Sequence, residues 1–267
     1  MTRSHTPVAI VTGAGGTGCG RALAARFARD GAAVVVSDVN DAGGAETVRL
    51  IAAEGGTAAF CRTDVRDEQQ VRDLITFGER TFGAVTVLIN NASAPYRPGE
   101  PLEHWADTVQ TDLLGAVFGT RHAIDAMRRA GGGAVVNIAS ISALWHGRKT
   151  PGVSPAYDTA KAGMIRLTTT LAGLAESDGI RVNCLAPGWI ATDGPRQYWD
   201  SLTPAQRLER GAPSTLLSTA QICDAVVRLA TDTSLAGRVL VWWSDDRPRF
   251  VEWGDRGYAK FVELPGL

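Results

Sequence analysis

The 267-residue chain lacks the features that mark several large classes of protein. Its 27 lysines and arginines are balanced by 28 aspartates and glutamates, which gives a formal net charge of −1. Nucleic acid and anionic membranes call for a basic excess, so the sequence favours neither as a partner. No apolar run approaches the roughly 20 residues of a membrane span. The polar segment 1–7 has no signal-peptide core, so we expect no export signal.

Cysteine, histidine and lysine are also scarce. The four cysteines contain no CxxC pair, which argues against a disulfide framework or a zinc site and favours a reducing cytoplasm. The four histidines show no metal-binding spacing such as HExxH, so we expect no metal. Only three of the 27 basic residues are lysines: Lys149, Lys161 and Lys260. Because lysine is so rare in this chain, each of the three is a candidate for a specific role.

Short β-branched runs alternate with longer helical patterns along the chain. Seven runs predict strands: 8–12, 34–38, 58–61, 85–90, 134–139, 181–185 and 239–243. Six stretches between them predict helices: 22–29, 45–54, 71–82, 105–129, 157–176 and 220–230. This alternation is typical of right-handed βαβ units and a parallel sheet covered on both faces. No linker or repeat interrupts it, so we expect one doubly wound α/β domain over 1–267 with a seven-stranded parallel sheet and an irregular region at 188–217.

A glycine-rich segment joins the first predicted strand to the first predicted helix. Gly13, Gly18 and Gly20 allow a tight turn and a close approach of the backbone to a pyrophosphate, while the helix N-terminus supplies free N–H groups. Asp38 lies 25 residues after Gly13, at the end of the second predicted strand. A carboxylate there accepts hydrogen bonds from ribose hydroxyls and repels a 2′-phosphate, which favours NAD over NADP. The alternative is that Asp38 only caps the following turn.

Asp64 and Val65 follow the third predicted strand. In a sheet of the usual order they lie beside the adenine of the dinucleotide. Asp64 also precedes a predicted helix, so a helix N-cap is an equal alternative.

Tyr157 and Lys161 are four residues apart and share one face of a predicted helix. A free tyrosine has a pKa of about 10. A nearby ammonium stabilises the phenolate and lowers that pKa, so the tyrosine can exchange a proton with a substrate oxygen. Ser140 follows the strand 134–139, at the edge where parallel sheets bind ligands. Its hydroxyl can hydrogen-bond a carbonyl oxygen, and Ser142 and Ser154 are alternatives for this role.

Taken in order, these segments resemble the short-chain dehydrogenase/reductase family from about Val8 to Gly237. Further segments carry the resemblance: Asn90-Asn91-Ala92, Arg181-Val182-Asn183 and Pro187-Gly188. The resemblance implies a Rossmann fold, with Tyr157 as the acid/base, Ser140 orienting the substrate oxygen, and Lys161 holding the nicotinamide ribose and tuning Tyr157. It implies further cofactor contacts from Asn90, Asn91, Pro187, Gly188, Ile190 and Thr192.

The chain departs from the family pattern in four places. One extra residue lies between Gly13 and Gly18, and Asp112 stands where the family has the asparagine of its catalytic tetrad. The resemblance therefore makes Asp112 a candidate catalytic residue. Ser140 and Tyr157 are further apart than usual, and the segment 241–246 replaces the usual Gly-Gly pair before a tail at 245–267.

Aromatic residues gather where the family binds its substrate. The enlarged segment after Ser140 carries Trp145 and His146, and the lid region 188–217 carries Trp189. Such walls suit an apolar or aromatic substrate. The aromatic tail 245–267 packs either on its own subunit or on a neighbour, and the resemblance implies a homotetramer or a dimer.

The sequence thus predicts an NAD-dependent oxidoreductase that interconverts a secondary alcohol and a ketone, with Tyr157 handling the proton. Alternatives are an NADP-dependent ketoreductase and a non-redox lyase or epimerase with bound NAD. A binding protein without catalysis is a third alternative, against which the intact set of Ser140, Tyr157 and Lys161 argues.

Overall fold

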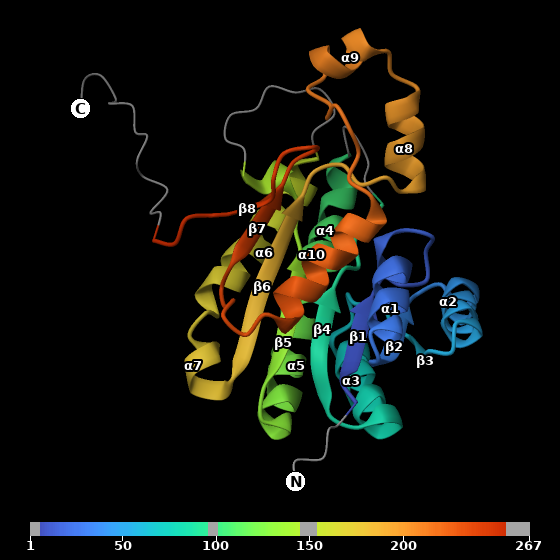
Figure 1. Ribbon diagram of the computed structural model, residues 1–267, viewed down its shortest axis with the longest axis vertical. Coiled ribbons are helices and arrows are strands. Elements are labelled where there is room, and N and C mark those ends of the chain that lie inside the picture. Colours follow the sequence, from blue (N-terminus) through green and yellow to red (C-terminus); the bar gives the residue numbers. More distant parts are fainter. Residues whose placement is uncertain (1–5, 96–100, 145–153, 255–267) are drawn as a thin grey trace.

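The computed structural model describes residues 6–95, 101–144 and 154–254. All its strands belong to one sheet of order β3-β2-β1-β4-β5-β6-β7-β8 (Figure 1). The strands are β1 Val8–Thr12, β2 Ala33–Asp38, β3 Thr57–Arg62, β4 Val85–Asn90, β5 Gly133–Ile138, β6 Ile180–Pro187, β7 Val239–Trp242 and β8 Arg249–Phe250. The strand order reverses between β1 and β4, which is the point where open α/β sheets bind their ligands.

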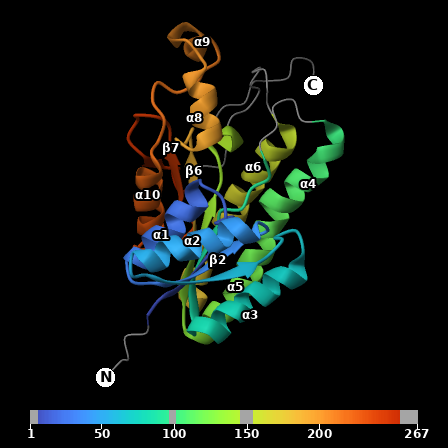
Figure 2. The same cartoon turned by 90° about the vertical axis from the view of Figure 1, so that its right-hand side faces the viewer.

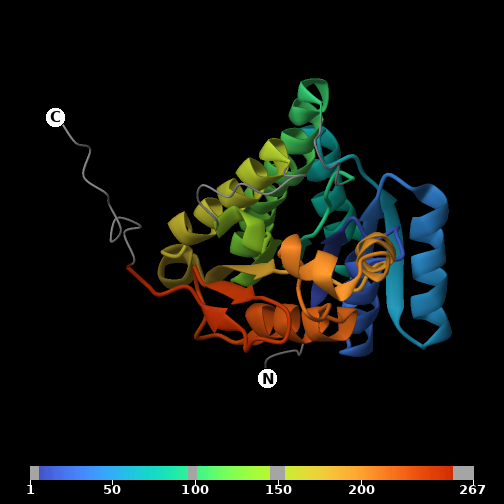
Figure 3. The same cartoon turned by 90° about the horizontal axis from the view of Figure 1, so that it is seen from above.

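Helices cover both faces of the sheet (Figure 3). They are α1 Cys19–Arg29, α2 Asp41–Ala53, α3 Glu68–Phe82, α4 Trp105–Val109, α5 Gly115–Ala130, α6 Pro155–Thr170, α7 Leu174–Asp178, α8 Asp193–Asp200, α9 Pro204–Glu209 and α10 Thr219–Thr231. Ala9 and Val11 of β1 pack in one core cluster with α1 and α10, while Val8 and Ile10 pack in a second cluster with α3 and α5. Because successive strand residues point to opposite faces, a strand buried on both sides is apolar throughout.

The sheet differs from the expected seven parallel strands by one strand. The strands β1 to β7 are parallel, and β8 adds an antiparallel edge through the pair Leu240 and Phe250. At two residues, β8 is too short to show a strand period in the sequence. Trp253 then lies against Gly237 and Arg238, so residues 245–254 of the tail pack on their own subunit.

Two of the long predicted helices are interrupted. The stretch 105–129 contains α4, a π-helical turn η2 at Gln110–Leu114, and α5. Within the stretch 157–176, the helix α6 ends at Thr170 and a second helix, α7, begins at Leu174. A π-helical turn leaves the apolar pattern nearly unchanged, so sequence periodicity does not reveal it.

The expectation of an irregular region at 188–217 is wrong, because this region contains α8 and α9 (Figure 2). Trp199 donates a hydrogen bond to Pro213 O at 2.9 Å, and the Arg207 guanidinium lies 3.3 Å from the centre of the Trp199 ring. The base of the region is closed by a bridge between Ile190 and Leu217. These contacts order a segment that rises beyond the carboxyl edge of the sheet.

The segment Arg181-Val182-Asn183 supports the fold rather than a ligand. Arg181 donates to the carbonyl oxygens of Ala230 and Asp232, and Asn183 Nδ2 donates to Leu229 O and Leu235 O. The bonds to Leu229 O and Ala230 O satisfy carbonyl groups that the end of α10 leaves without helical partners. They fix α10 against β6.

Among the described residues, no helix combines the length and the apolar character needed to cross a bilayer.

Candidate active site

The glycine loop between β1 and α1 is a crowded turn. Gly13 has φ +67°, and a Cβ there would lie 2.7 Å from Ala92 Cα. A Cβ on Gly20 would lie 2.1 Å from Gly13 O. Only glycine fits these two positions. Gly18 caps α1 without a side-chain hydrogen bond, so the first N–H groups of α1 are left for a ligand.

The extra residue of the loop is accommodated against Asp38. The Gly15 N–H donates to Asp38 Oδ2 at 2.7 Å, and a Cβ on Gly15 would lie 2.8 Å from Asp38 Cγ. Asp38 Oδ1 accepts from the Asn40 N–H at 2.9 Å, so Asp38 also caps the turn after β2. Arg21 donates to Gly15 O at 3.3 Å. The longer loop is therefore a fixed turn, and Asp38 is one of its supports.

The two asparagines after β4 do different things. Asn91 Nδ2 donates to Thr12 O at 2.9 Å and to Gly13 O at 3.2 Å, so Asn91 holds the glycine loop. Asn90 Nδ2 donates to Asn137 Oδ1 at 2.8 Å and to Thr120 Oγ1 at 3.0 Å inside the core. The Asn90 side chain thus joins β4 to β5 and α5, and only its backbone is left to border a cofactor.

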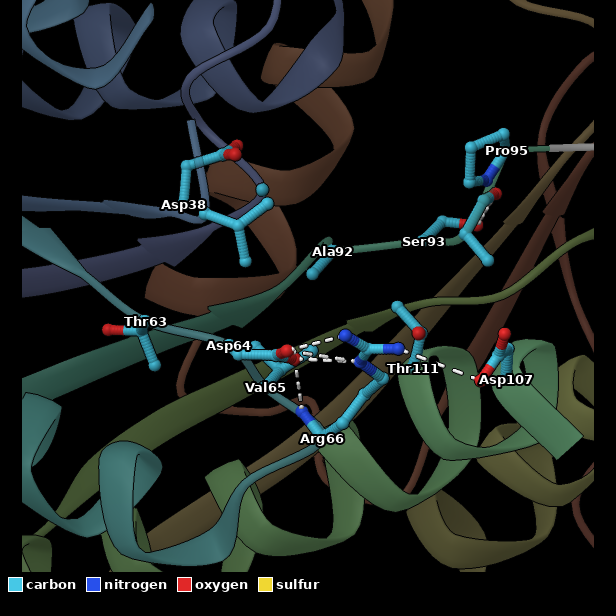
Figure 4. A pocket seen from close by; sticks show the side chains of 13 residues that line it. Asp38, Thr63, Asp64, Val65, Arg66, Ala92, Ser93, Pro95, Asp107 and Thr111 are labelled. Carbon is cyan, nitrogen blue, oxygen red and sulfur yellow. Dashed lines mark hydrogen bonds and ion pairs between the residues drawn. The ribbon is translucent and has the colours of Figure 1, made fainter. Parts of the chain in front are cut away.

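A cavity of ≈ 260 Å³ lies at the carboxyl ends of β1 to β4 (Figure 4). Its lining includes four predicted residues: Gly13, Asp38, Asp64 and Val65. It also includes Ala92, which belongs to a segment that carries the family resemblance, and residues that the sequence did not single out: Val39, Thr63, Arg66, Ser93, Ala94, Pro95, Asp107 and Thr111. Asp38 stands on one side, and Arg66 and Thr111 stand on the other (Figure 4). The predicted adenosine residues therefore share one cavity.

Asp64 is held by Arg66. The Arg66 guanidinium donates to Asp64 Oδ1 at 3.0 Å and to Oδ2 at 2.7 Å, and this hydrogen bonding keeps the pKa of Asp64 below its ordinary value. Arg66 Nη1 also lies 3.6 Å from Asp107 Oδ1 in α4. The N-cap of α3 is Asp67, which accepts from the backbone of Gln69 and Gln70. The N-cap interpretation of Asp64 is therefore wrong.

Of the three candidate serines, Ser140 is the one whose hydroxyl acts on Tyr157, where it acts to lower the pKa of the phenol. Ser142 donates its N–H at 3.2 Å and its hydroxyl at 3.1 Å to Ser140 Oγ. Ser154 is the N-cap of α6 and accepts from the Tyr157 N–H at 3.3 Å. Ser142 thus orients Ser140, and Ser154 starts the helix that carries Tyr157.

Lys161 lies beneath Tyr157 and is paired with Asp112. Lys161 Nζ is 5.3 Å from the centre of the Tyr157 ring and 3.1 Å from Asp112 Oδ2, and it donates to Ile138 O at 3.1 Å. The side chains of Lys161 and Asp112 are 3% and 0% exposed. Asp112 also accepts from Ser93 Oγ, and from the Ala94 N–H at 2.7 Å. The π-helical turn η2 brings this carboxylate to the lysine.

Burial and charge act in opposite directions on these groups. Loss of solvent raises the pKa of Tyr157; the Lys161 ammonium acts to lower that pKa, and the Asp112 carboxylate acts to raise it. For Lys161, burial acts to lower the pKa, but Asp112 and Tyr157 together hold it above its ordinary value. In the free protein, Lys161 is therefore charged and Tyr157 is protonated at neutral pH.

The lid begins at Pro187 and Gly188, where β6 ends. The Gly188 N–H donates to Trp242 O at 2.7 Å, and a Cβ on Gly188 would lie 2.7 Å from Trp243 Cε3. The tryptophans that replace the family's Gly-Gly pair thus require glycine at the start of the lid. Trp189 lies 5.8 Å from Tyr198, measured between ring centres.

Thr192 and the start of α8 reach the glycine loop. A Cβ on Gly18 would lie 3.5 Å from Thr192 Cγ2. Thr17 Oγ1 donates to Asp193 Oδ2 at 2.6 Å. The Thr192 N–H donates to Ile190 O at 2.7 Å. The lid therefore closes over the same loop that Asp38 supports.

Trp145 and His146, predicted at the substrate pocket, lie outside the described residues. Among the residues that the structure does describe, no group of histidine, cysteine and acidic side chains is placed to hold a metal ion.

The chain is similar to proteins of one family. The family model described as short chain dehydrogenase matches residues 7–202. Cis-4-hydroxycyclohexanecarboxylate dehydrogenase from Sinomonas cyclohexanicum is 34% identical over 249 residues, which cover 91% of this chain and 91% of that protein.

Solved structures agree with this match. A protein described as a short-chain dehydrogenase/reductase from Burkholderia xenovorans has a TM-score of 0.79 and 32% identity, covering 90% of this chain and 95% of that one. A 7α-hydroxysteroid dehydrogenase, complexed with NADH and 7-oxo glycochenodeoxycholic acid, has a TM-score of 0.77 and 29% identity, covering 89% and 92%. The chain therefore belongs to the short-chain dehydrogenase/reductase family of oxidoreductases.

Proposed function

We propose that this chain is an NAD-dependent dehydrogenase that interconverts a secondary alcohol and a ketone. The observation that carries the proposal is the grouping of three side chains: the Lys161 ammonium lies 5.3 Å from the centre of the Tyr157 ring, and the Ser140 hydroxyl acts to lower the pKa of Tyr157. This grouping offers a proton donor and acceptor, an orienting hydroxyl and a nearby positive charge.

The residues around the glycine loop fit a dinucleotide. A Cβ at Gly13 would collide with Ala92 and one at Gly20 with the Gly13 carbonyl, so these glycines allow the tight turn before α1, whose first N–H groups suit a pyrophosphate. Asp38, Asp64 and Val65 line the cavity that would take the adenosine. Residues expected at the nicotinamide half are Lys161, Pro187, Gly188, Ile190 and Thr192. When bound, the nicotinamide would supply the hydride acceptor or donor.

The chain's own residues would handle the proton. In the oxidative direction the Tyr157 oxygen takes the hydroxyl proton of the alcohol, and in the reductive direction it returns that proton to the ketone oxygen. The Ser140 hydroxyl, oriented by two hydrogen bonds from Ser142, would hold the substrate oxygen beside Tyr157. Lys161 would hold the ribose and stabilise the Tyr157 phenolate.

Three features support NAD over NADP. Asp38 is fixed by the N–H groups of Gly15 and Asn40 and would place its charge against a 2′-phosphate. Val39 and Asn40, which follow it, carry no positive charge. Arg66 is the one basic residue among the described residues lining the cavity, and its guanidinium is bound to Asp64.

A cyclic secondary alcohol is the substrate class that we propose. Two proteins similar to this chain are named as dehydrogenases of a hydroxycyclohexane ring and of a hydroxysteroid. The aromatic pair Trp189 and Tyr198 at the start of the lid supplies an apolar wall for such a ring. The lid 188–217, together with Trp145 and His146, would complete the pocket within one domain, and a dimer or tetramer is the expected assembly.

The test is turnover with a panel of cyclic secondary alcohols, followed by the absorbance of reduced nicotinamide, with NAD⁺ and with NADP⁺. We expect NAD⁺-dependent oxidation by the wild-type protein and a loss of at least about 100-fold in Tyr157→Phe. Thr76→Val, which removes a hydroxyl from an exposed position on α3, is the control and should retain activity. Equal turnover in wild type and Tyr157→Phe would contradict the proposal.

A further inference from the structure

Asp112 is buried among hydrogen-bond donors, and only a carboxylate can accept from all of them. Its oxygens face three donors: the Lys161 ammonium, the Ser93 hydroxyl and the Ala94 N–H. A carboxylate only accepts hydrogen bonds, whereas an asparagine amide has a donor at one end. An asparagine at position 112 would have to turn its NH₂ group toward one of these donors. The site is therefore built for the charged residue.

The pairing cancels most of the local charge. Both side chains are almost fully buried, so little water screens the carboxylate from the ammonium. An ammonium by itself favours the phenolate form of Tyr157, and a carboxylate opposes it. Because the two charges lie 3.1 Å apart, Tyr157 experiences their difference.

The other groups around this pair do not restore a positive charge. Among the described residues, those that act on Tyr157 are Lys161 and Asp158 on α6, Asp112 on η2 and the Ser140 hydroxyl after β5. The Cys184 thiol on β6 acts on Lys161. One positive group thus faces two carboxylates around Tyr157.

We propose that Asp112 is a positioning residue that locks the Lys161 ammonium in place and offsets its charge at the Tyr157 hydroxyl. The neutral form of Tyr157 is then favoured up to higher pH than it would be with an uncharged residue at position 112. At neutral pH the site is accordingly set to donate a proton, as ketone reduction requires, and alcohol oxidation gains rate only as the pH rises. This proposal rests on the proposed role of Tyr157 as the acid/base.

The experiment measures Tyr157 ionisation directly, without cofactor or substrate. The tyrosinate absorbance of the wild-type protein is titrated with pH, and the same titration of Tyr157→Phe is subtracted. The difference between Asp112→Asn and Asp112→Asn/Tyr157→Phe is obtained in the same way. We expect the wild-type midpoint to lie above the value of about 10 for free tyrosine, and Asp112→Asn to lower it by about one pH unit or more.

Two further variants separate charge from packing. Asp112→Glu keeps the charge and should return the midpoint toward the wild-type value. Ser93→Ala removes one hydrogen bond to Asp112 but no charge, and should leave the midpoint unchanged. Asp112→Ser is a smaller neutral variant for the case in which Asp112→Asn does not fold, and it should lower the midpoint as well.

An unchanged midpoint in a folded neutral variant would overturn the proposal. If neither neutral variant folds, a wild-type midpoint well below 10 would overturn it. Failure of the proposed function has a different signature: no turnover with any alcohol, while Asp112→Asn still shifts the Tyr157 titration.

Discussion

Asp38 Oδ2 accepts a hydrogen bond of 2.7 Å from the backbone N–H of Gly15. The residue expected to recognise the cofactor ribose is therefore also a support of the loop expected to hold the pyrophosphate. Gly15 belongs to the loop that is one residue longer than the family pattern. Cofactor choice and loop geometry are consequently linked through one side chain.

Asp38→Ala should narrow the preference for NADH over NADPH, because it removes the charge that opposes the 2′-phosphate. It should also weaken NADH binding by about tenfold or more, because a hydrogen bond to a charged group is lost from the loop. The measurement is the dissociation constant of each nucleotide. Asp38→Asn keeps one acceptor for Gly15, so it should narrow the preference with a smaller loss of NADH affinity. An unaltered preference in both variants would contradict this account of cofactor choice.

Gly15→Ala should destabilise the protein, since its Cβ would lie 2.8 Å from Asp38 Cγ and 3.1 Å from Asn40 O. Crowding of this kind costs about 1–3 kcal/mol. Gly16→Ala is the matched control, because its Cβ meets no atom closer than 4.0 Å. Urea unfolding of the free protein compares the two variants. Equal stabilities would show that the loop yields easily at Gly15.

Gly188→Ala should disturb the start of the lid, because its Cβ would lie 2.7 Å from Trp243 Cε3. We expect lower stability and lower turnover, while Gly194→Ala, which meets nothing within 4 Å, should change neither. Trp243→Leu combined with Gly188→Ala should relieve part of the loss, so the two changes should not be additive. Strict additivity would mean that the indole and Gly188 do not compete for space.

The pair of Asp64 and Arg66 predicts a pH-dependent stability. Hydrogen bonding to Arg66 lowers the folded-state pKa of Asp64. The stabilisation is therefore fully present above the unfolded-state pKa of about 3.9 and is lost as the pH falls through the lower folded-state value. The difference in unfolding free energy between wild type and Arg66→Ala should be constant near neutral pH and shrink below about pH 4.

Arg72→Ala is the control for this pair, because Arg72 lies on the adjoining α3 and has no ion pair with any described residue. It should show no such pH dependence. If the difference in unfolding free energy between wild type and Arg66→Ala stays constant down to pH 2, the pair of Asp64 and Arg66 does not stabilise the protein in this way.

The predictable part of the site is the part that local sequence encodes. Gly13 and Gly20 are imposed by one strand–turn–helix segment, and the four-residue spacing of Tyr157 and Lys161 places both on one face of α6. The seven parallel strands follow equally from their apolar runs and the helices between them. Asp38 was predicted from its position at the end of β2.

The rest depends on packing between segments that are distant in sequence. Arg66 pairs with Asp107, which the distant helix α4 brings within 3.6 Å, and no sequence pattern distinguishes this arginine from the others. Ser93 contacts Asp112 only because a π-helical turn redirects that carboxylate into the core. The contact of Trp243 with Gly188 joins two strand ends that are far apart in the chain.

The central claim is that this chain holds a working NAD site beside Tyr157. Its most direct test is a paired titration of the protein with NADH and NADPH, following energy transfer from its seven tryptophans to the reduced nicotinamide. We predict saturable binding of NADH and at least about tenfold weaker binding of NADPH, because Asp38 opposes the 2′-phosphate. Tighter binding of NADPH, or binding of neither nucleotide, would contradict the account.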